Sequence, residues 1–265
     1  MKYRLVLIIL LGCIAGLVVA VRWGDVLPAQ TPPFPLRELR IGVDASLPPF
    51  AYVVGDELVG LEIEIGRALG AELGLPVRFV NIGIDGLVDA LLTGQVDVLL
   101  SAFVAEPWRT GDVIYTRPYF DAGLVLLSLA ESPVATMRDL PGQALAYEYG
   151  SLADNEARLW LRRIPAFETR PYELPDVALD AVRLGEADAA LVDAVTACLY
   201  LADYPTWSVS RQYVTHQQLV MAVDLHRGTT FQAIDRALGR IMARGVVDGL
   251  LQAWLGGCYT EDDDG

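Results

Sequence analysis

Short apolar runs alternate with amphipathic stretches along most of the chain. The apolar runs that predict strands are 39–43, 77–80 and 97–100, with a hairpin over 50–59. Stretches with apolar residues at helical spacing predict helices over 61–73, 86–93, 153–161, 230–244 and 246–255. The first two of these helices are followed by Gly74 and Gly94, and glycine is the commonest helix C-cap. Because strands that alternate with helices form parallel βαβ units, the pattern predicts an α/β fold.

One segment of this pattern occurs twice. Residues 90–100 and 181–191 each contain a helix end, a glycine, a two-residue turn, an aspartate (Asp97 or Asp188) and a buried strand. A single unit of this kind is an ordinary connection between a helix and a strand. Two of them, about ninety residues apart, indicate two similar lobes.

The connection between the lobes follows from two further apolar stretches. Residues 123–128 form a strand long enough to cross from one lobe to the other, and 218–223 supplies the return. The last helices then pack on the first lobe, so the second lobe is an insertion joined by a two-strand hinge. We expect lobe 1 at 38–126 and 218–257, and lobe 2 at 127–217.

The N-terminus has the composition of an export signal. A basic start precedes an apolar run over 5–21, which is close to the shortest length that spans a bilayer as a helix. Residues 1–22 therefore predict a signal peptide or a membrane anchor. Three outcomes stay open: an uncleaved anchor, a lipoprotein with Cys13 as the lipidation candidate in a lipobox-like Leu-Leu-Gly-Cys, or cleavage after Ala20. All three place the folded part outside the cytoplasm, in the periplasm or on the outer face of the membrane.

The segments that flank the folded part differ from it in composition. Residues 23–37 contain four prolines and predict a semi-rigid spacer, and 258–265 predicts a solvated acidic tail. The net charge of −14 repels phosphate backbones, so nucleic acid is not an expected partner. Cys198 and Cys258 either form a disulfide, as an oxidising compartment allows, or remain one buried thiol and one thiol near the tail.

Eight short segments occur in an order that is typical of one protein family. They are Arg40–Asp44, Pro48–Phe50, Gly60–Glu64, Asp85–Leu87, Gly94–Asp97, Pro107–Arg109, Arg117–Tyr119 and Asp248–Leu250. Together they resemble the bacterial extracellular solute-binding proteins of family 3, the periplasmic binding proteins of polar amino-acid ABC importers. The resemblance implies the two-lobe Venus-flytrap fold (periplasmic binding protein type II), with an amino-acid-like ligand between the lobes. It also implies an ABC permease as membrane partner. We further expect a monomer and no cofactor or metal.

A free amino acid has a carboxylate and an ammonium group, and two charged residues match them. Arg109 suits the carboxylate because a guanidinium donates two parallel hydrogen bonds, and the family's arginine at this place in the motif does so. Asp193 follows the second repeated segment at a strand end and matches the family's ammonium-binding aspartate. The alternatives are that Arg109 closes a helix or pairs with Glu106, and that Asp193 only caps the next helix.

Four other residues are candidate contacts. Asp44, at the end of the first strand, suits an ammonium or side-chain contact. Gly150 and Ser151 precede a predicted helix whose backbone N–H groups can receive a carboxylate. Glu148 lies where the family presents second-lobe contacts and would favour a cationic ligand, although a glutamate at a strand end can also simply be solvated.

The chain departs from the family pattern at four candidate contacts. The family usually has a hydroxyl residue where this chain has Val104, and Gly or Ser near Ala102. It usually has aromatic residues where this chain has Leu47 and Ile84. These changes remove one donor to the carboxylate and make the side-chain end of the cleft aliphatic. Either another donor substitutes, or the ligand is not a standard α-amino acid.

Two other functions are consistent with this reading. A few proteins that resemble the family are cyclohexadienyl or arogenate dehydratases, and Glu148 or Asp193 could act there as the acid. The two histidines, His216 and His226, do not have metal-ligand spacing, and no Walker or nucleophile-elbow motif occurs. The second possibility is a ligand-sensing module without transport.

Overall fold

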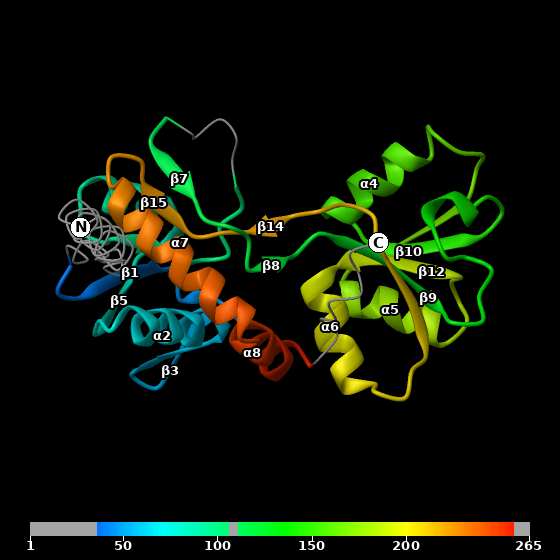
Figure 1. Cartoon of the computed structure of the whole chain (residues 1–265). Helices are drawn as coiled ribbons and strands as arrows, with labels where there is room; N and C mark the ends of the chain where they lie inside the picture. The colour runs from blue at the N-terminus through cyan, green and yellow to red at the C-terminus, as the bar shows by residue number, and fades with distance from the viewer. Residues whose placement is uncertain (1–35, 106–110, 257–265) are drawn as a thin grey trace, which may run out of the picture. The chain divides into compact units, whose positions relative to one another are not determined.

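The computed structural model describes residues 36–105 and 111–256, which form two lobes, each built on a five-stranded sheet (Figure 1). The strand order is β5-β1-β6-β15-β7 in the first sheet and β11-β10-β12-β9-β13 in the second. In each sheet three neighbouring strands pair in parallel, and the other two join through antiparallel pairs. The predicted α/β fold with two lobes is confirmed.

The first lobe contains most of the predicted helices. Its sheet consists of β1 (Leu39–Val43), β5 (Val77–Asn81), β6 (Val98–Leu99), β7 (Val113–Tyr115) and β15 (Ala222–Asp224). Beside it lie a small sheet of β2 (Ser46–Leu47), β3 (Ala51–Val54) and β4 (Glu57–Val59), and helices α2 (Leu61–Leu73), α3 (Ile84–Leu92), α7 (Gly228–Ala243) and α8 (Val246–Leu255). Helix α3 begins two residues earlier than predicted, because the backbone N–H of Ile84 donates to the distant carboxylate of Asp44.

The second lobe repeats the arrangement of parallel strands and covering helices. Its sheet consists of β9 (Leu124–Leu129), β10 (Ala144–Glu148), β11 (Glu168–Tyr172), β12 (Ala189–Asp193) and β13 (Val209–Tyr213). Its helices are the short 3-10 helix η2 (Met137–Asp139) and helices α4 (Leu152–Trp160), α5 (Pro175–Arg183) and α6 (Ala194–Asp203). Strand β10 pairs in parallel with β11 and β12, so the carboxyl ends of these three strands lie at one edge.

The segments that join the lobes are shorter than the sequence predicts. β8 (Phe120–Asp121) and β14 (Gln218–Leu219) form a two-stranded antiparallel pair that belongs to neither large sheet. The predicted crossing strand at 123–128 is wrong, because that stretch is β9, which pairs with both β12 and β13 inside the second sheet. An apolar strand with neighbours on both sides lies in a sheet interior, so the hinge falls at β8 instead. The lobe boundaries themselves stay a prediction.

The repeated sequence segment has one structural role in both lobes. Asp97 Oδ2 accepts a hydrogen bond from the backbone N–H of Arg40 at 3.0 Å, and Asp188 Oδ2 accepts one from Ala144 at 2.7 Å. The glycine three residues before each aspartate has a positive φ, 73° and 75°, which closes the helix and turns the chain. Each aspartate thus ties a helix–strand connection to the start of the neighbouring parallel strand.

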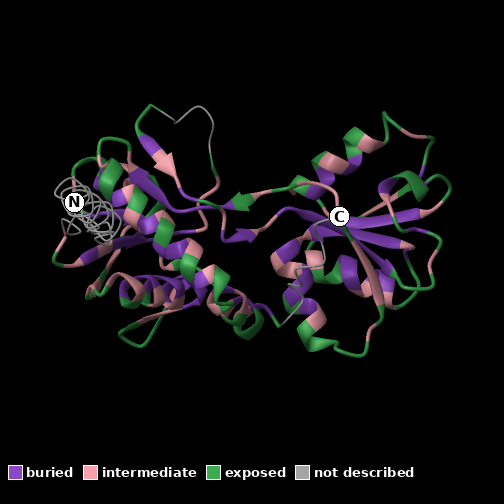
Figure 2. Ribbon diagram, viewed as in Figure 1, coloured by how far each residue is buried: buried purple, intermediate pink, exposed green. Residues whose placement is uncertain are grey.

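Burial follows the two sheets, whose strands are mostly covered while the helices keep one exposed face (Figure 2). In α2, Leu61, Ile65 and Leu69 are fully buried at a spacing of four residues. Such spacing places their side chains on one face of the helix. This apolar face therefore packs into the core of the first lobe.

Several predictions concern residues outside the described ranges. They are the anchor at 1–22, the lipidation candidate Cys13, the spacer at 23–37 up to residue 35, and the tail at 258–265. Within 36–105 and 111–256, no helix is long and apolar enough to span a membrane. Cys198 is buried and disulfide-bonded, whereas both other cysteines lie outside the described residues.

Candidate ligand-binding site

A pocket of about 200 Å³ lies at the carboxyl ends of β10 and β12, which are neighbouring parallel strands. Ligands of open α/β sheets bind at this edge. The described residues that line the pocket come from the second lobe and from the segments next to the hinge: Ala122, Leu124, Glu148, Ser151, Leu152, Ala153, Pro175, Leu191, Val192, Asp193 and Gln217. The pocket thus combines a mostly aliphatic wall with two carboxylates and two uncharged polar side chains.

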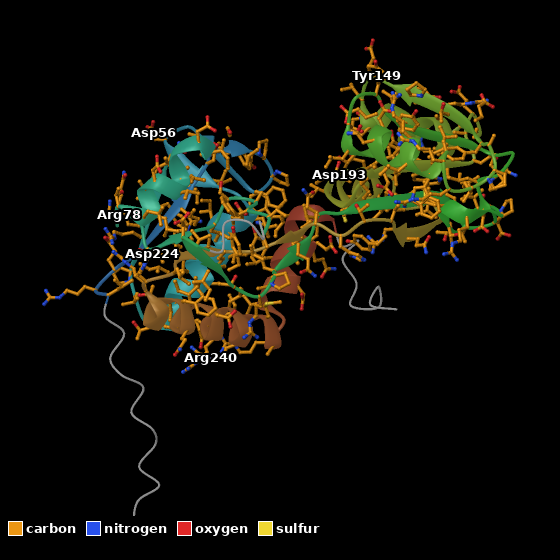
Figure 3. The ribbon with its side chains drawn as sticks, turned by 90° about the horizontal axis from the view of Figure 1, so that it is seen from above. Asp56, Arg78, Tyr149, Asp193, Asp224 and Arg240 are labelled. Atoms are coloured by element: carbon orange, nitrogen blue, oxygen red, sulfur yellow. The ribbon has the colours of Figure 1, made fainter. Side chains whose placement is uncertain are left out.

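Asp193 is the last residue of β12 and the N-cap of α6. Its Oδ1 accepts from the backbone N–H of Thr196 at 2.9 Å, and its Oδ2 accepts from the Thr196 hydroxyl at 2.6 Å. Asp193 therefore caps helix α6, as one of the two alternatives predicted. Asp193 also lines the pocket, and each carboxylate oxygen has a further lone pair for a ligand donor. Figure 3 shows Asp193 far from Tyr149, which projects from the lobe into solvent.

Glu148 is the last residue of β10 and is half-buried at the pocket wall. Its backbone carbonyl accepts from the Ser151 hydroxyl at 2.8 Å. Within the described part of the chain, its carboxylate has no hydrogen bond and no ion pair, unlike that of Asp193. A half-buried carboxylate without a partner is available to a cationic ligand.

The backbone N–H groups at the N-terminus of α4 already donate to acceptors within the chain. The backbone N–H of Gly150 donates to Asp154 Oδ2 at 3.0 Å, and the N–H of Ser151 points to the Glu148 carbonyl at 3.4 Å. The Ser151 hydroxyl accepts from the N–H groups of Ala153 and Asp154. A hydrogen bond from Arg158 lowers the pKa of Asp154. The chain's own carboxylate thus occupies the position that we expected for a ligand carboxylate.

The first-lobe candidates form a separate group. Asp44 is buried, with Oδ1 accepting from the N–H of Ser46 at 3.0 Å and Oδ2 from that of Ile84 at 2.8 Å. A hydrogen bond with the Ser46 side chain is the largest cause that lowers the pKa of Asp44, and the N–H groups of Ile84 and Ser46 lower it further. Leu47 and Ile84 are both exposed, at 36% and 50%. The structure therefore brings Asp44 and Ile84 together and leaves the aliphatic side chains of Leu47 and Ile84 uncovered.

Ala102 and Val104 lie where β6 leads toward the hinge. Ala102 has a φ of 44°, and its N–H donates to Glu62 Oε1 at 2.5 Å. The hydroxyl of Tyr119 donates to the same oxygen, and burial raises the pKa of Glu62 to about 7. Val104 forms a bridge with Leu219 of the hinge strand β14. Val104 is thus joined to the hinge, and Ala102 to helix α2 of the first lobe.

Arg109 lies outside the described residues, so its place in the site stays a prediction. Among the other candidates, Glu148, Ser151 and Asp193 line one pocket. Leu152, Pro175 and Gln217 line it too but follow no chemical pattern in the sequence, so they were not predicted. Asp154 was not predicted either, although Ser151-x-x-Asp154 is a capping-box spacing that marks Asp154 as an acceptor for an N–H group at the start of the helix.

Comparison with known proteins agrees with this architecture. The model of the bacterial extracellular solute-binding proteins, family 3, matches residues 39–257. The arginine-binding extracellular protein ArtP of Bacillus subtilis is 26% identical over 61% of this chain, a match that spans 63% of that protein. The ABC transporter arginine-binding protein 1 of Escherichia coli is 24% identical over 83% of this chain and 91% of its own length.

A solved structure with the same fold is an ancestral cationic amino acid solute-binding protein. It has a TM-score of 0.63 and 27% identity, and the match covers 83% of this chain and 96% of that one. The family match extends over most of the described residues, both sheets and the hinge included. The chain therefore belongs to the bacterial extracellular solute-binding proteins, family 3.

Proposed function

We propose that this protein is the substrate-binding component of an ABC importer and that its substrate is an amino acid or an amino-acid derivative. The observation that carries the proposal is Asp193, a carboxylate at the carboxyl end of β12 that lines the pocket. The relatives whose names state a ligand support it, because those names give arginine, histidine, cystine or cationic amino acids.

The two charged ends of the substrate would be held by different lobes. Asp193 binds the ammonium group, and Arg109 donates two parallel hydrogen bonds to the carboxylate. Asp44, Ala102 and Val104 contribute first-lobe contacts, while Leu47 and Ile84 cover the substrate's side chain. Ser151 lines the second-lobe wall, and the N–H groups of Gly150 and Ser151 do not donate to the substrate because they already have acceptors.

Such a division of contacts explains how binding would be signalled. A ligand shifts a conformational equilibrium only by the difference in its affinity for the two states. If Asp193 and Arg109 contact one molecule from opposite lobes, only a closed state gains both contacts. The closed state would then present the surface that the permease recognises.

The remaining parts of the proposal concern location and turnover. The folded part works outside the cytoplasm as a monomer, and the N-terminal segment tethers it to the membrane. The protein binds its substrate without chemical turnover. Incubation with prephenate or arogenate tests this point, since release of water and carbon dioxide from either would indicate a dehydratase.

Calorimetry on the purified folded part, with a panel of the twenty amino acids, tests the proposal. Asp193→Asn keeps a good N-cap but removes the charge, and it should weaken binding about tenfold or more. Thr196→Val perturbs the same cap without removing charge and should change affinity little. Arg109→Ala should also weaken binding. Binding of no amino acid, or equal affinity in wild type and Asp193→Asn, would refute the assignment.

A further inference from the structure

The second-lobe wall of the pocket has only negative charge. Its described lining residues include Glu148 and Asp193 but no lysine, arginine or histidine. Ser151 and Gln217 are its uncharged polar members. Two carboxylates on one small pocket repel each other and any anion, and they attract cations.

The two carboxylates differ in how far the protein already satisfies them. Asp193 accepts two hydrogen bonds from Thr196. The Glu148 carboxylate accepts no hydrogen bond within the described residues, although Glu148 is half-buried. Removing a carboxylate from water is costly unless a partner compensates for it. Glu148 therefore has more to gain from a ligand cation than Asp193 has.

A third carboxylate, that of Asp154, lies at the N-terminus of α4, where a ligand anion would otherwise be attracted. It is buried, accepts the Gly150 N–H and pairs with Arg158 at 2.7 Å. Helix N-termini attract anions through free N–H groups and the positive end of the helix dipole. With Asp154 in that position, α4 does not offset the charge of Glu148 for the ligand.

We propose that the ligand has two cationic groups and that Glu148 binds the second, so that the substrate class is amino acids with a cationic side chain. This inference rests on the proposed function, in which Asp193 binds the α-ammonium group. A neutral amino acid would leave the Glu148 carboxylate unpaired at the wall.

The shape of the pocket fits a ligand of this kind. Leu124, Leu152 and Pro175 give its wall apolar surface, which suits the methylene chain of lysine, ornithine or arginine. Its volume of about 200 Å³ lies below the roughly 300–1,000 Å³ of sites for drug-sized ligands. The pocket is therefore suited to a molecule as small as a single amino acid.

Calorimetry with matched ligand pairs tests the inference. Arginine should bind wild type at least about tenfold more tightly than citrulline, its uncharged isostere, and lysine more tightly than norleucine. Glu148→Gln should remove most of this preference while leaving citrulline affinity nearly unchanged. Glu173→Gln, an exposed substitution in the same lobe but not on this pocket, loses the same charge and should keep the preference.

The outcomes separate this inference from the function on which it rests. If wild type binds citrulline as tightly as arginine, amino-acid binding stands and the cationic class is wrong. If Glu148→Gln weakens both ligands equally, or Glu173→Gln weakens the preference as much, Glu148 does not select the cation. If no amino acid binds, the proposed function fails first. If putrescine binds as tightly as ornithine, the cationic subsite stands but the carboxylate contact does not.

Discussion

Gly123 packs directly against the backbone of Thr215 where the two hinge segments enter the second lobe. A Cβ atom on Gly123 would lie 2.0 Å from the Thr215 carbonyl oxygen and 2.9 Å from the Cα of His216. The neighbouring hydrogen bonds hold the segments in this position, since Asp121 Oδ1 accepts from the N–H groups of Gly123 and Gln217. The close approach therefore fixes the geometry beside the pocket, which Ala122 and Gln217 line.

We expect Gly123→Ala to damage both stability and binding. The atoms in the way belong to the backbone, so the two segments must move apart, at a cost of about 1–3 kcal/mol in unfolding free energy. Gly228→Ala is the matched control, because Gly228 begins α7 and no atom lies within 4 Å of the added Cβ. Urea unfolding and calorimetry measure the two effects. Equal stability of Gly123→Ala and wild type would show that the segments separate easily.

The buried Glu62 should make stability depend on pH near neutrality. Its pKa is about 7 in the folded protein against an ordinary 4.5, so between these values the folded state holds a proton that the unfolded state has lost. Stability from this group is thus complete below pH 4.5 and is lost as the pH rises to about 7, by roughly 3 kcal/mol in all. Glu62→Gln stays neutral and still accepts from Tyr119 and Ala102.

The measurement is urea unfolding of wild type and Glu62→Gln at pH 5 and pH 8. The variant should gain stability relative to wild type at the higher pH. Glu64→Gln, on the same helix but paired with Arg67 at the surface, should show no such gain. A Glu62→Gln difference that is the same at both pH values would mean that Glu62 titrates as in the unfolded chain.

Much of the fold could be predicted because its signals are local. The apolar spacing of α2 and its terminal Gly74 gave the observed bounds, and the segments around Asp97 and Asp188 indicated two lobes that the structure has. The hinge could not be placed in this way. An apolar run such as 124–129 looks the same whether it crosses between lobes or lies inside a sheet, and only its pairing with β12 and β13 decides.

The site was predictable only in part, for a related reason. Asp193 and Glu148 stand at strand ends, and strand ends can be read from the sequence. Whether these carboxylates already have hydrogen-bond donors cannot be read from the sequence, because it depends on which groups the folded chain brings near them. Thr196 donates two hydrogen bonds to the Asp193 carboxylate. The N–H of Gly150, which we expected to be available to a ligand, donates to Asp154.

The two repeated aspartates should differ in their importance for stability. Asp97 has no exposed surface and contacts both Arg40, at 2.6 Å, and Arg227, at 2.9 Å. Asp97→Asn leaves two guanidinium groups without their counter-charge and should cost about 3 kcal/mol. Asp188→Asn is the control: its amide oxygen can still accept from the Ala144 N–H, so we expect about 1 kcal/mol. Thermal and urea unfolding compare them, and equal losses would mean that the backbone contact, common to both, dominates.

Cys198 should be bonded to Cys258. The described chain ends at Gly256, where an added Cβ would lie 2.2 Å from the Cβ of Ala202 and 3.5 Å from the carbonyl oxygen of Cys198. Two further residues span at most about 7 Å, which is sufficient for Cys258 to reach Cys198 from there.

Because α6 lies in the second lobe and α8 beside the first sheet, this bond would limit how far the lobes separate. Non-reducing peptide mapping should recover the 198–258 pair, and reduction should lower stability by up to about 4 kcal/mol for a loop of this length. Recovery of a 13–198 pair instead would place the N-terminal segment, and not α8, against α6.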